Sequence, residues 1–285
     1  MTASADGLRL LRAFVLLLLG APYAASSTAP APPELKATTL RSFREYVART
    51  EARNQENLRA DAFLWIDQLP APAKSADRES LQRGEIVMER LTGGDTGIPA
   101  EIRGGMIHDW RGIVFIPGAT LAHTLAILQD YNHHAIYYAP DVERSRIESH
   151  EGNHFQVFMR FRRHKVVTVV LNTVQDITYF SDSPTRAHSR STAISIREVV
   201  NAGTPEEQEK SPEEDNGFLW EMETWWRMEE RDGGVYVQNE AVTLTRDIPT
   251  GLGWLIGPFV SSIPKETLQF TLEATRKAVL GKSAY

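Results

Sequence analysis

The chain contains no cysteine among its 285 residues. It therefore has no disulfide bond and no cysteine that could carry a lipid, so its stability has to come from a packed core. It also contains no Asn-x-Ser or Asn-x-Thr site for N-glycosylation. These absences fit an exported bacterial protein better than an ectodomain held together by disulfides.

Basic residues are also scarce, since 31 Lys and Arg stand against 37 Asp and Glu and give a net charge of -6. A protein that binds nucleic acid regardless of sequence needs clustered Lys and Arg to neutralise phosphates, and no basic stripe occurs. We therefore expect no nucleic-acid partner. Hydrophobic residues make up 42% of the chain, enough for a complete core, so we expect a folded protein.

An apolar run near the start, residues 13–19, is too short to cross a bilayer. Arg9 and Arg12 precede it and small residues follow at 24–29, which is the pattern of a secretory signal peptide. We expect residues 1–28 to be removed, which takes away two Arg and one Asp and changes the net charge from -6 to -7. The mature protein is expected in the periplasm or outside the cell, without a membrane span.

The remaining chain divides by composition near residue 83. A proline-rich linker at 29–33 is followed by an amphipathic helix over residues 38–62 and by an apolar stretch at 63–69 that should dock on the main body. Residues 29–82 are thus a linker and N-terminal helical extension, and residues 83–285 form the main domain. The helical spacing of the extension is carried by Leu40, Phe43, Tyr46 and Val47.

Alternating strands dominate the main domain, and tight turns between successive strands imply antiparallel pairing. A short helix with Leu121, Leu125 and Leu128 on one face interrupts them. An acidic loop at 204–215 is expected to be a solvated, mobile tip. The expected strands are 85–91, 106–117, 141–150, 154–163, 165–180, 189–200, 218–230 and 235–246.

The last helix is expected to begin at Ser262, whose hydroxyl can cap a helix, with Pro264 in its first turn. Gly281 is a suitable stop. A stripe of residues at helical spacing should cover something apolar. The stripe consists of Leu268, Leu272, Thr275 and Val279.

Two segments resemble the START-like superfamily, which includes lipid-transfer, polyketide-cyclase-like and coenzyme Q-binding-like proteins. The first is LTRDIPTGLGWLIGPFVSSIPKETLQFTLEATRKAV at the C-terminal end, and the second is FIPGATLAHTLAILQDYNHHAIYYAPDVERSRI. The resemblance covers roughly Gly104 to Leu280. It implies an α+β helix-grip fold, in which a curved antiparallel sheet wraps around a long C-terminal helix and leaves a hydrophobic ligand cavity between them.

Under this fold, the inward strand faces and the last helix supply the residues that would contact a ligand. Met and Trp line adaptable apolar cavities, although most clusters of this kind are simply core. The candidate ligand-binding residues are Phe155, Val157, Met159, Phe161, Trp220, Met222, Trp226, Met228, Glu240, Leu268, Leu272 and Arg276.

Glu240 is the one candidate with a case as an acid or base. It lies in the middle of a strand, where a carboxylate either faces water or is buried, and burial would raise its pKa unless a cation such as Arg276 paired with it. The turn at 232–234 permits registers that point Glu240 to either face, so its direction stays open.

Residues 150–154 match the zinc-protease pattern H-E-x-x-H. That chemistry needs a helix, which places both imidazoles on one side. Gly152 and Asn153 are poor helix formers and the flanks have strand character, so we interpret the segment as a β-hairpin turn. No metal and no other cofactor is expected.

The leading hypothesis is an exported START-like protein that binds a hydrophobic small molecule, such as a lipid, quinone or polyketide-like compound, without chemistry. One alternative is a cyclase- or dehydratase-like enzyme with an acid or base in the pocket. Another is a structural or partner-binding module of the cell envelope, which a filled or collapsed cavity together with an exposed apolar patch on residues 38–66 would favour. Transient contact with a membrane stays open.

Overall fold

The structure is a computed structural model that describes residues 34–59, 62–93, 101–164, 168–247 and 253–281, without the side chains of 101 and 253–261. The expected signal peptide at 1–28 and linker at 29–33 lie outside the described residues. Beyond Pro32, the described residues form one compact unit. The helical extension and the sheet therefore belong to the same body, and residue 83 marks no gap between them.

The described elements agree closely with the expected ones. The helices are α2 Ala37–Arg59, η1 Trp65–Gln68, α3 Ala71–Gln82, α4 Leu121–Gln129, η2 Tyr131–His133, α5 His134–Tyr137, η3 Pro212–Glu214 and α6 Gly253–Val279. The strands are β1 Val87–Leu91, β2 Glu101–Ile102, β3 Gly105–Pro117, β4 Val142–Glu151, β5 His154–His164, β6 Thr168–Ser183, β7 Arg186–Val200, β8 Gln208–Glu209, β9 Glu221–Arg231 and β10 Gly234–Thr245. Among the described helices, none is long and apolar enough to span a membrane.

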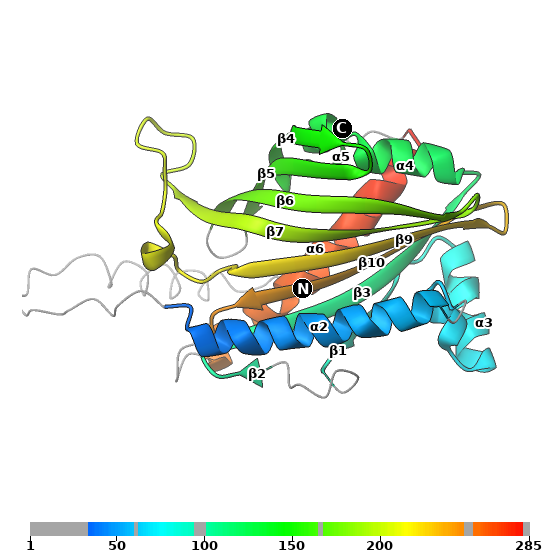
Figure 1. Cartoon of the computed structure of the whole chain (residues 1–285), viewed down its shortest axis with the longest axis horizontal. Helices are drawn as coiled ribbons and strands as arrows, with labels where there is room; N and C mark the ends of the chain where they lie inside the picture. Colours follow the sequence, from blue (N-terminus) through cyan, green and yellow to red (C-terminus); the bar gives the residue numbers. More distant parts are fainter. Residues whose placement is uncertain (1–33, 60–61, 94–100, 165–167, 248–252, 282–285) are drawn as a thin grey trace, which may run out of the picture. The chain divides into compact units, whose positions relative to one another are not determined.

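The strands form one antiparallel sheet in the order β1-β3-β10-β9-β7-β6-β5-β4, with β2 beside β3 and β8 beside β7. After β3 the chain passes through α4 and α5 to β4 at the far edge, and then returns strand by strand until β10 pairs with β3. Figure 1 shows α2 on one face of this sheet and α6 on the other. We call these the outer face and the inner face.

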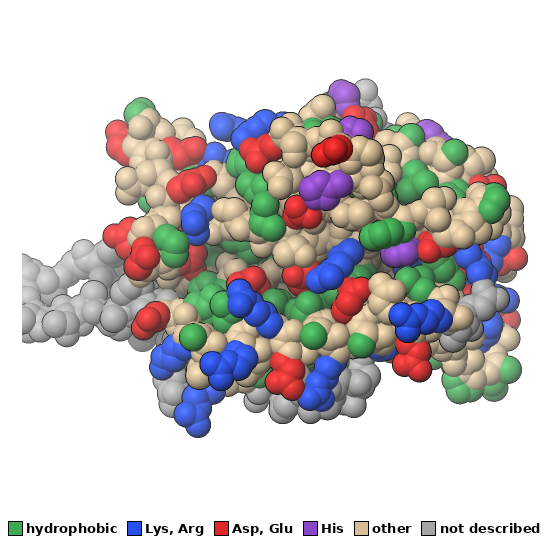
Figure 2. Space-filling model, in the orientation of Figure 1, with side chains coloured by type: hydrophobic (Ala, Val, Ile, Leu, Met, Phe, Trp, Pro, Cys, Tyr) green, Lys and Arg blue, Asp and Glu red, His purple; other side chains and the backbone are tan. Residues whose placement is uncertain are grey.

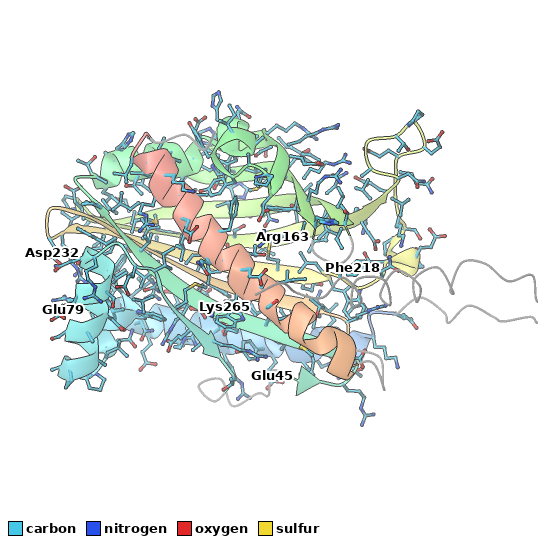
Figure 3. The ribbon with its side chains drawn as sticks, turned by 180° about the vertical axis from the view of Figure 1, so that it is seen from behind. Glu45, Glu79, Arg163, Phe218, Asp232 and Lys265 are labelled. Carbon is cyan, nitrogen blue, oxygen red and sulfur yellow. The ribbon has the colours of Figure 1, made fainter. Side chains whose placement is uncertain are left out.

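The inner face is packed against α6 by a large apolar cluster. Figure 3 shows α6 running diagonally across this face, with Lys265 near its middle. One close contact is at Gly112 of β3, where an added Cβ would lie 2.8 Å from Leu272 Cδ1 and 3.4 Å from Leu268 Cδ2. Only glycine lets the helix come this near without displacing those side chains. The predicted helix-grip fold, a curved sheet around the C-terminal helix, is confirmed.

The outer face carries the N-terminal extension. Phe43, Tyr46 and Val47 of α2 pack on Ile107 and Val242 of the sheet. The apolar stretch after α2 joins a second cluster, so its predicted docking on the main body is confirmed. That second cluster contains Phe63, Leu64, Trp65, Ile66, Leu81, Ile113, Phe115 and Tyr236.

The predicted start of the last helix is wrong, because α6 begins at Gly253 and runs on through Ser262 and Pro264. The Ser-x-Pro pattern indicated a helix start because proline suits a first turn. However, the fixed φ of proline is itself helical, so the same pattern is compatible with a position inside a helix when the local packing tolerates the lost N–H bond.

The acidic loop is solvated as expected but is also anchored. Arg160 of β5 is only 3% exposed and donates to both carboxylate oxygens of Glu207 at 2.7 and 2.8 Å. Hydrogen bonds from Arg160, and then from the backbone N–H of Gly203, lower the pKa of Glu207 to about 2. A paired guanidinium and carboxylate of this geometry orients the loop against the sheet.

Replacing Glu207 by glutamine is expected to release this loop, because the amide cannot accept both Arg160 bonds. The measurement is limited proteolysis followed by mass spectrometry, and cleavage between Asn201 and Lys210 should become several-fold faster. Glu206→Gln is the matched control, since Glu206 is exposed next to it. Equal cleavage rates in the two variants would contradict the anchoring role.

Candidate functional site

One part of the inner face is less buried than the rest, between the Gly112 contact and the end of β10. Eight of its inward side chains are half-buried, whereas His108 and Asn239 beside them are buried. The register aligns them across strands, since Trp110, Ala241 and Thr224 are successive partners, as are Thr243 and Met222. We define the inner trough as Met106, Met159, Ile196, Met222, Thr224, Trp226, Ala241 and Thr243.

The composition of the inner trough suits an apolar guest. Three of its side chains are methionines, whose flexible thioethers adapt to irregular partners, and Trp226 adds an aromatic surface. The neighbouring inner face of β7 carries the small residues Ser189, Ser191 and Ala193, which are buried. The described side chains of the inner trough are uncharged.

The β6–β7 side of this region contains polar groups that satisfy one another. Ser191 Oγ donates to Gln175 Oε1 at 3.1 Å, and Gln175 Nε2 donates to Thr173 Oγ1 at 3.2 Å. Thr173 Oγ1 in turn donates to the carbonyl oxygen of Met159 at 3.2 Å. These polar groups on the β6–β7 side therefore have hydrogen-bond partners without a ligand.

The β3–β10 side contains His108, Trp110 and Asn239. His108 Nε2 lies 3.1 Å from Thr245 Oγ1. Burial, and then repulsion by Arg90, lowers the pKa of His108 to about 4, so the ring is neutral at pH 7.

The twelve-residue set named from the sequence is divided by the structure. Met159, Met222 and Trp226 lie in the inner trough. Phe161 packs instead with Tyr138 and Val142 near the far edge of the sheet. The buried members belong to the main core, and they are Phe155, Val157, Met228, Leu268 and Leu272.

Two further members are misplaced. Trp220 was expected on the inner face, but it precedes β9 and packs with the cluster under α2 on the outer face. Arg276 was considered as a partner for Glu240, but its guanidinium donates to the carbonyl oxygen of Gly84 and lines a surface groove.

Glu240 points to the outer face, so its assignment to the ligand cavity is wrong. The turn between β9 and β10 has two residues, Asp232 at φ 54° and Gly233 at φ 75°, and this register turns Val235 and Val237 inward. Such a pair of positive φ angles is the type I′ hairpin turn. Glu240 is 1% exposed and pairs with Arg53 of α2.

Glu240 belongs to a buried polar network between α2 and the sheet that the sequence reasoning missed. Tyr46 donates to Asp109 Oδ2 at 2.8 Å, and Arg227 donates to Asn54 Oδ1 at 2.7 Å. Burial, and then the Glu240 carboxylate, raises the pKa of Asp109. One signal was available in the sequence: Thr50 and Asn54 continue the helical stripe of Phe43 and Tyr46, and both are buried.

The H-E-x-x-H segment is the β-hairpin turn that was expected. Gly152 lies between β4 and β5 with φ 61°, and the His150 ring stacks on Phe155 with centroids 4.0 Å apart. Within the described part of the chain, no group of three or more potential metal-ligating side chains comes together.

Two surface pockets lie outside the inner trough. One of about 440 Å³ lies between β1 and α6 and includes Met88, Lys265 and Glu273. The other, of about 130 Å³, lies between α2 and strands β7 and β9 and includes Leu58 and Trp225. Figure 2 shows the hollow beside α2, with hydrophobic side chains in its floor.

A buried histidine near the far edge makes stability depend on pH. Burial lowers the pKa of His134 from 6.5 to about 4. The unfolded chain therefore binds more protons than the folded one between these values, and stability is lost as pH falls from 6.5 to about 4. His134→Phe should remove roughly 3 kcal/mol of that loss. Urea unfolding of the wild type and of His134→Phe between pH 6.5 and 4 measures this difference. An identical dependence of the unfolding free energy on pH in the two proteins would contradict the prediction.

Comparison with known proteins finds similarity of structure only. No family model matches the chain, and no curated protein matches its sequence. The STAR-related lipid transfer protein of Xanthomonas axonopodis (fragment 25–204) is 16% identical, with 68% of this chain and 98% of that one covered at a TM-score of 0.44. Human STARD10 is 8% identical, with 75% and 83% covered at a TM-score of 0.41.

An aromatase/cyclase from a Streptomyces species, Zhui, is 10% identical, with 61% of this chain and 94% of that one covered at a TM-score of 0.40. These structural neighbours are START-like proteins, as the sequence resemblance indicated. With identities and TM-scores this low, they bear on neither ligand nor activity. The fold assignment depends on the sheet order and on α6.

Proposed function

We propose that the protein binds an apolar small molecule, such as a lipid, quinone or polyketide-like compound, in the inner trough and carries it without chemical change. The observation that carries the proposal is the set of half-buried Met, Trp and Ile side chains on the inner face. Covering such surface gains roughly 25 cal/mol per Å² removed from water. An apolar guest is the partner that this surface favours.

Carriage is favoured over catalysis by the position of the acidic groups. The enzymatic alternative depended on Glu240, which lies on the outer face in contact with Arg53. The described side chains of the inner trough offer no charged acid or base. The envelope-module alternative would be favoured by a filled or collapsed cavity together with an exposed apolar patch on residues 38–66, and Phe43, Tyr46 and Trp65 there are buried.

Binding is tested by isothermal titration calorimetry with naphthalene as an apolar probe. Ala241→Phe fills the inner trough and should weaken binding at least about tenfold, because the added ring takes the place of the guest. Ile194→Gln is the control, since Ile194 is an exposed apolar side chain of β7. Unchanged affinity for naphthalene in Ala241→Phe, or a loss of affinity in Ile194→Gln, would show that naphthalene binds outside the inner trough.

The proposed place of action is the cell envelope or the surrounding medium. Arg9, Arg12 and the apolar run at 13–19 support export by a cleaved signal peptide. Expression of the full chain in a bacterium followed by intact-mass measurement tests this. A protein that keeps its first 28 residues and stays in the cytoplasm would overturn it.

A further inference from the structure

The two sides of the inner trough differ in whether their buried polar groups have partners. On the β6–β7 side, Ser191, Gln175 and Thr173 are linked by hydrogen bonds. On the β3–β10 side, three buried nitrogen atoms have no hydrogen-bond partner within the described part of the chain. They are Asn239 Nδ2, Trp110 Nε1 and His108 Nδ1.

These three atoms belong to neighbouring positions. His108 and Trp110 are successive inward residues of β3, and they pair with Thr243 and Ala241 of β10. Asn239 is the next inward residue of β10 after Ala241. The three side chains therefore flank Ala241 and Thr243, both of which line the inner trough. Asn239 is 3% exposed and His108 is 1% exposed.

The hydrogen bonds around His108 determine what its free nitrogen can do. Thr245 Oγ1 donates its hydrogen to the carbonyl oxygen of Arg246 at 3.2 Å, so it accepts from His108 Nε2–H. A neutral imidazole carries one N–H, and Nδ1 is then an acceptor. This side of the inner trough thus offers two donors, from Asn239 and Trp110, and one acceptor.

Buried polar groups without partners are unfavourable, and a bound molecule that supplies the missing bonds is favoured over one that does not. These atoms are out of contact with bulk water, so their missing bonds must come from a buried water or from a bound molecule. Met222, the partner of Thr243 in the register, is the flexible neighbour best able to give way.

We propose that His108, Trp110 and Asn239 bind the polar end of the ligand, and that this end is uncharged, with a carbonyl-type oxygen facing Asn239 and Trp110 and a hydroxyl facing His108. The inference depends on the proposed function, and it narrows the ligand to apolar hydroxy-carbonyl compounds. A carboxylate or phosphate is disfavoured, because none of the three residues that would contact it carries a charge, although Lys265 Nζ lies 5.9 Å from the centre of the Trp110 ring.

The test compares four probes by isothermal titration calorimetry on the wild-type protein. They are naphthalene, acetylnaphthol with its ketone and hydroxyl on opposite rings, the methyl ether of that compound, and the matching hydroxynaphthoic acid. Acetylnaphthol should bind most tightly. Loss of the hydroxyl hydrogen in the ether should weaken binding about tenfold relative to acetylnaphthol, and the ionised acid should bind more weakly still.

Asn239→Leu provides a second measurement. It should weaken the binding of acetylnaphthol about tenfold and leave the binding of naphthalene unchanged, because only the contact between Asn239 and the carbonyl oxygen is lost. Asn172→Leu, the same substitution on the outer face of β6, is the control and should change neither affinity.

The outcomes separate this inference from the proposed function. If naphthalene and all three derivatives bind with the same affinity, the polar site is refuted while carriage of apolar molecules stands. If no probe binds, naphthalene included, the proposed function fails and this inference fails with it.

Discussion

Replacing Arg53 by methionine is expected to lower the free energy of unfolding by about 3–5 kcal/mol. Arg53 on α2 forms an ion pair with Glu240, which is 1% exposed beneath the helix and also interacts with the buried Arg227. Without that cation a carboxylate stays buried beside Asp109, which is itself buried. Urea unfolding at pH 7 measures the loss.

Substituting Glu240 as well as Arg53 distinguishes the loss of an ion pair from the loss of packing. In the double variant Arg53→Met, Glu240→Met, part of the stability should return, because two apolar side chains can replace a buried pair, although the buried Arg227 then lacks the Glu240 carboxylate. Arg49→Met on the same helix is the control, since Arg49 pairs with the exposed Glu45. It should change stability by less than about 0.5 kcal/mol. A double variant as unstable as the single one would contradict this account.

Truncating Leu272 to alanine is expected to cost about 2–5 kcal/mol. Leu272 is fully buried at the contact between α6 and Gly112 of the sheet. Gly112→Ala alone should cost about 1–3 kcal/mol, because its new Cβ would lie 2.8 Å from Leu272 Cδ1. Thermal and urea unfolding of both variants measure these losses.

The combination of the two substitutions tests the contact itself. The alanine methyl at position 112 would occupy part of the space that Leu272 leaves, so the double variant should be more stable than the sum of the single losses predicts. Lys277→Ala, on the exposed side of α6, is the control and should have little effect. Strict additivity would show that helix and sheet are not in contact at Gly112.

Much of the fold could be predicted because its signals are local. The alternation in residues 154–163 and the apolar stripe of Leu268 and Leu272 each depend on neighbouring residues, and the structure contains β5 and the buried face of α6 there. The H-E-x-x-H segment was interpreted correctly for the same reason, since Gly152 disfavours a helix within the motif itself.

The site was harder to predict because it depends on register and on distant partners. The turn at Asp232 and Gly233 decides which face Glu240 occupies, and the sequence permitted both. Arg53 lies far from Glu240 in the chain, so no local pattern joins them. The unpartnered atoms of His108 and Asn239 become visible only once their surroundings are known.

The pairing of β3 with β10 has a consequence for how the molecule is made. β3 is the first long strand of the described chain to emerge from the ribosome. Its neighbour on the side away from β1 is β10, the last described strand. The middle of the sheet therefore cannot close until synthesis has nearly finished, and contacts this distant in sequence form slowly. Until then the edge of β3 that β10 will cover stays unpaired, and unpaired strand edges favour aggregation of the incomplete chain.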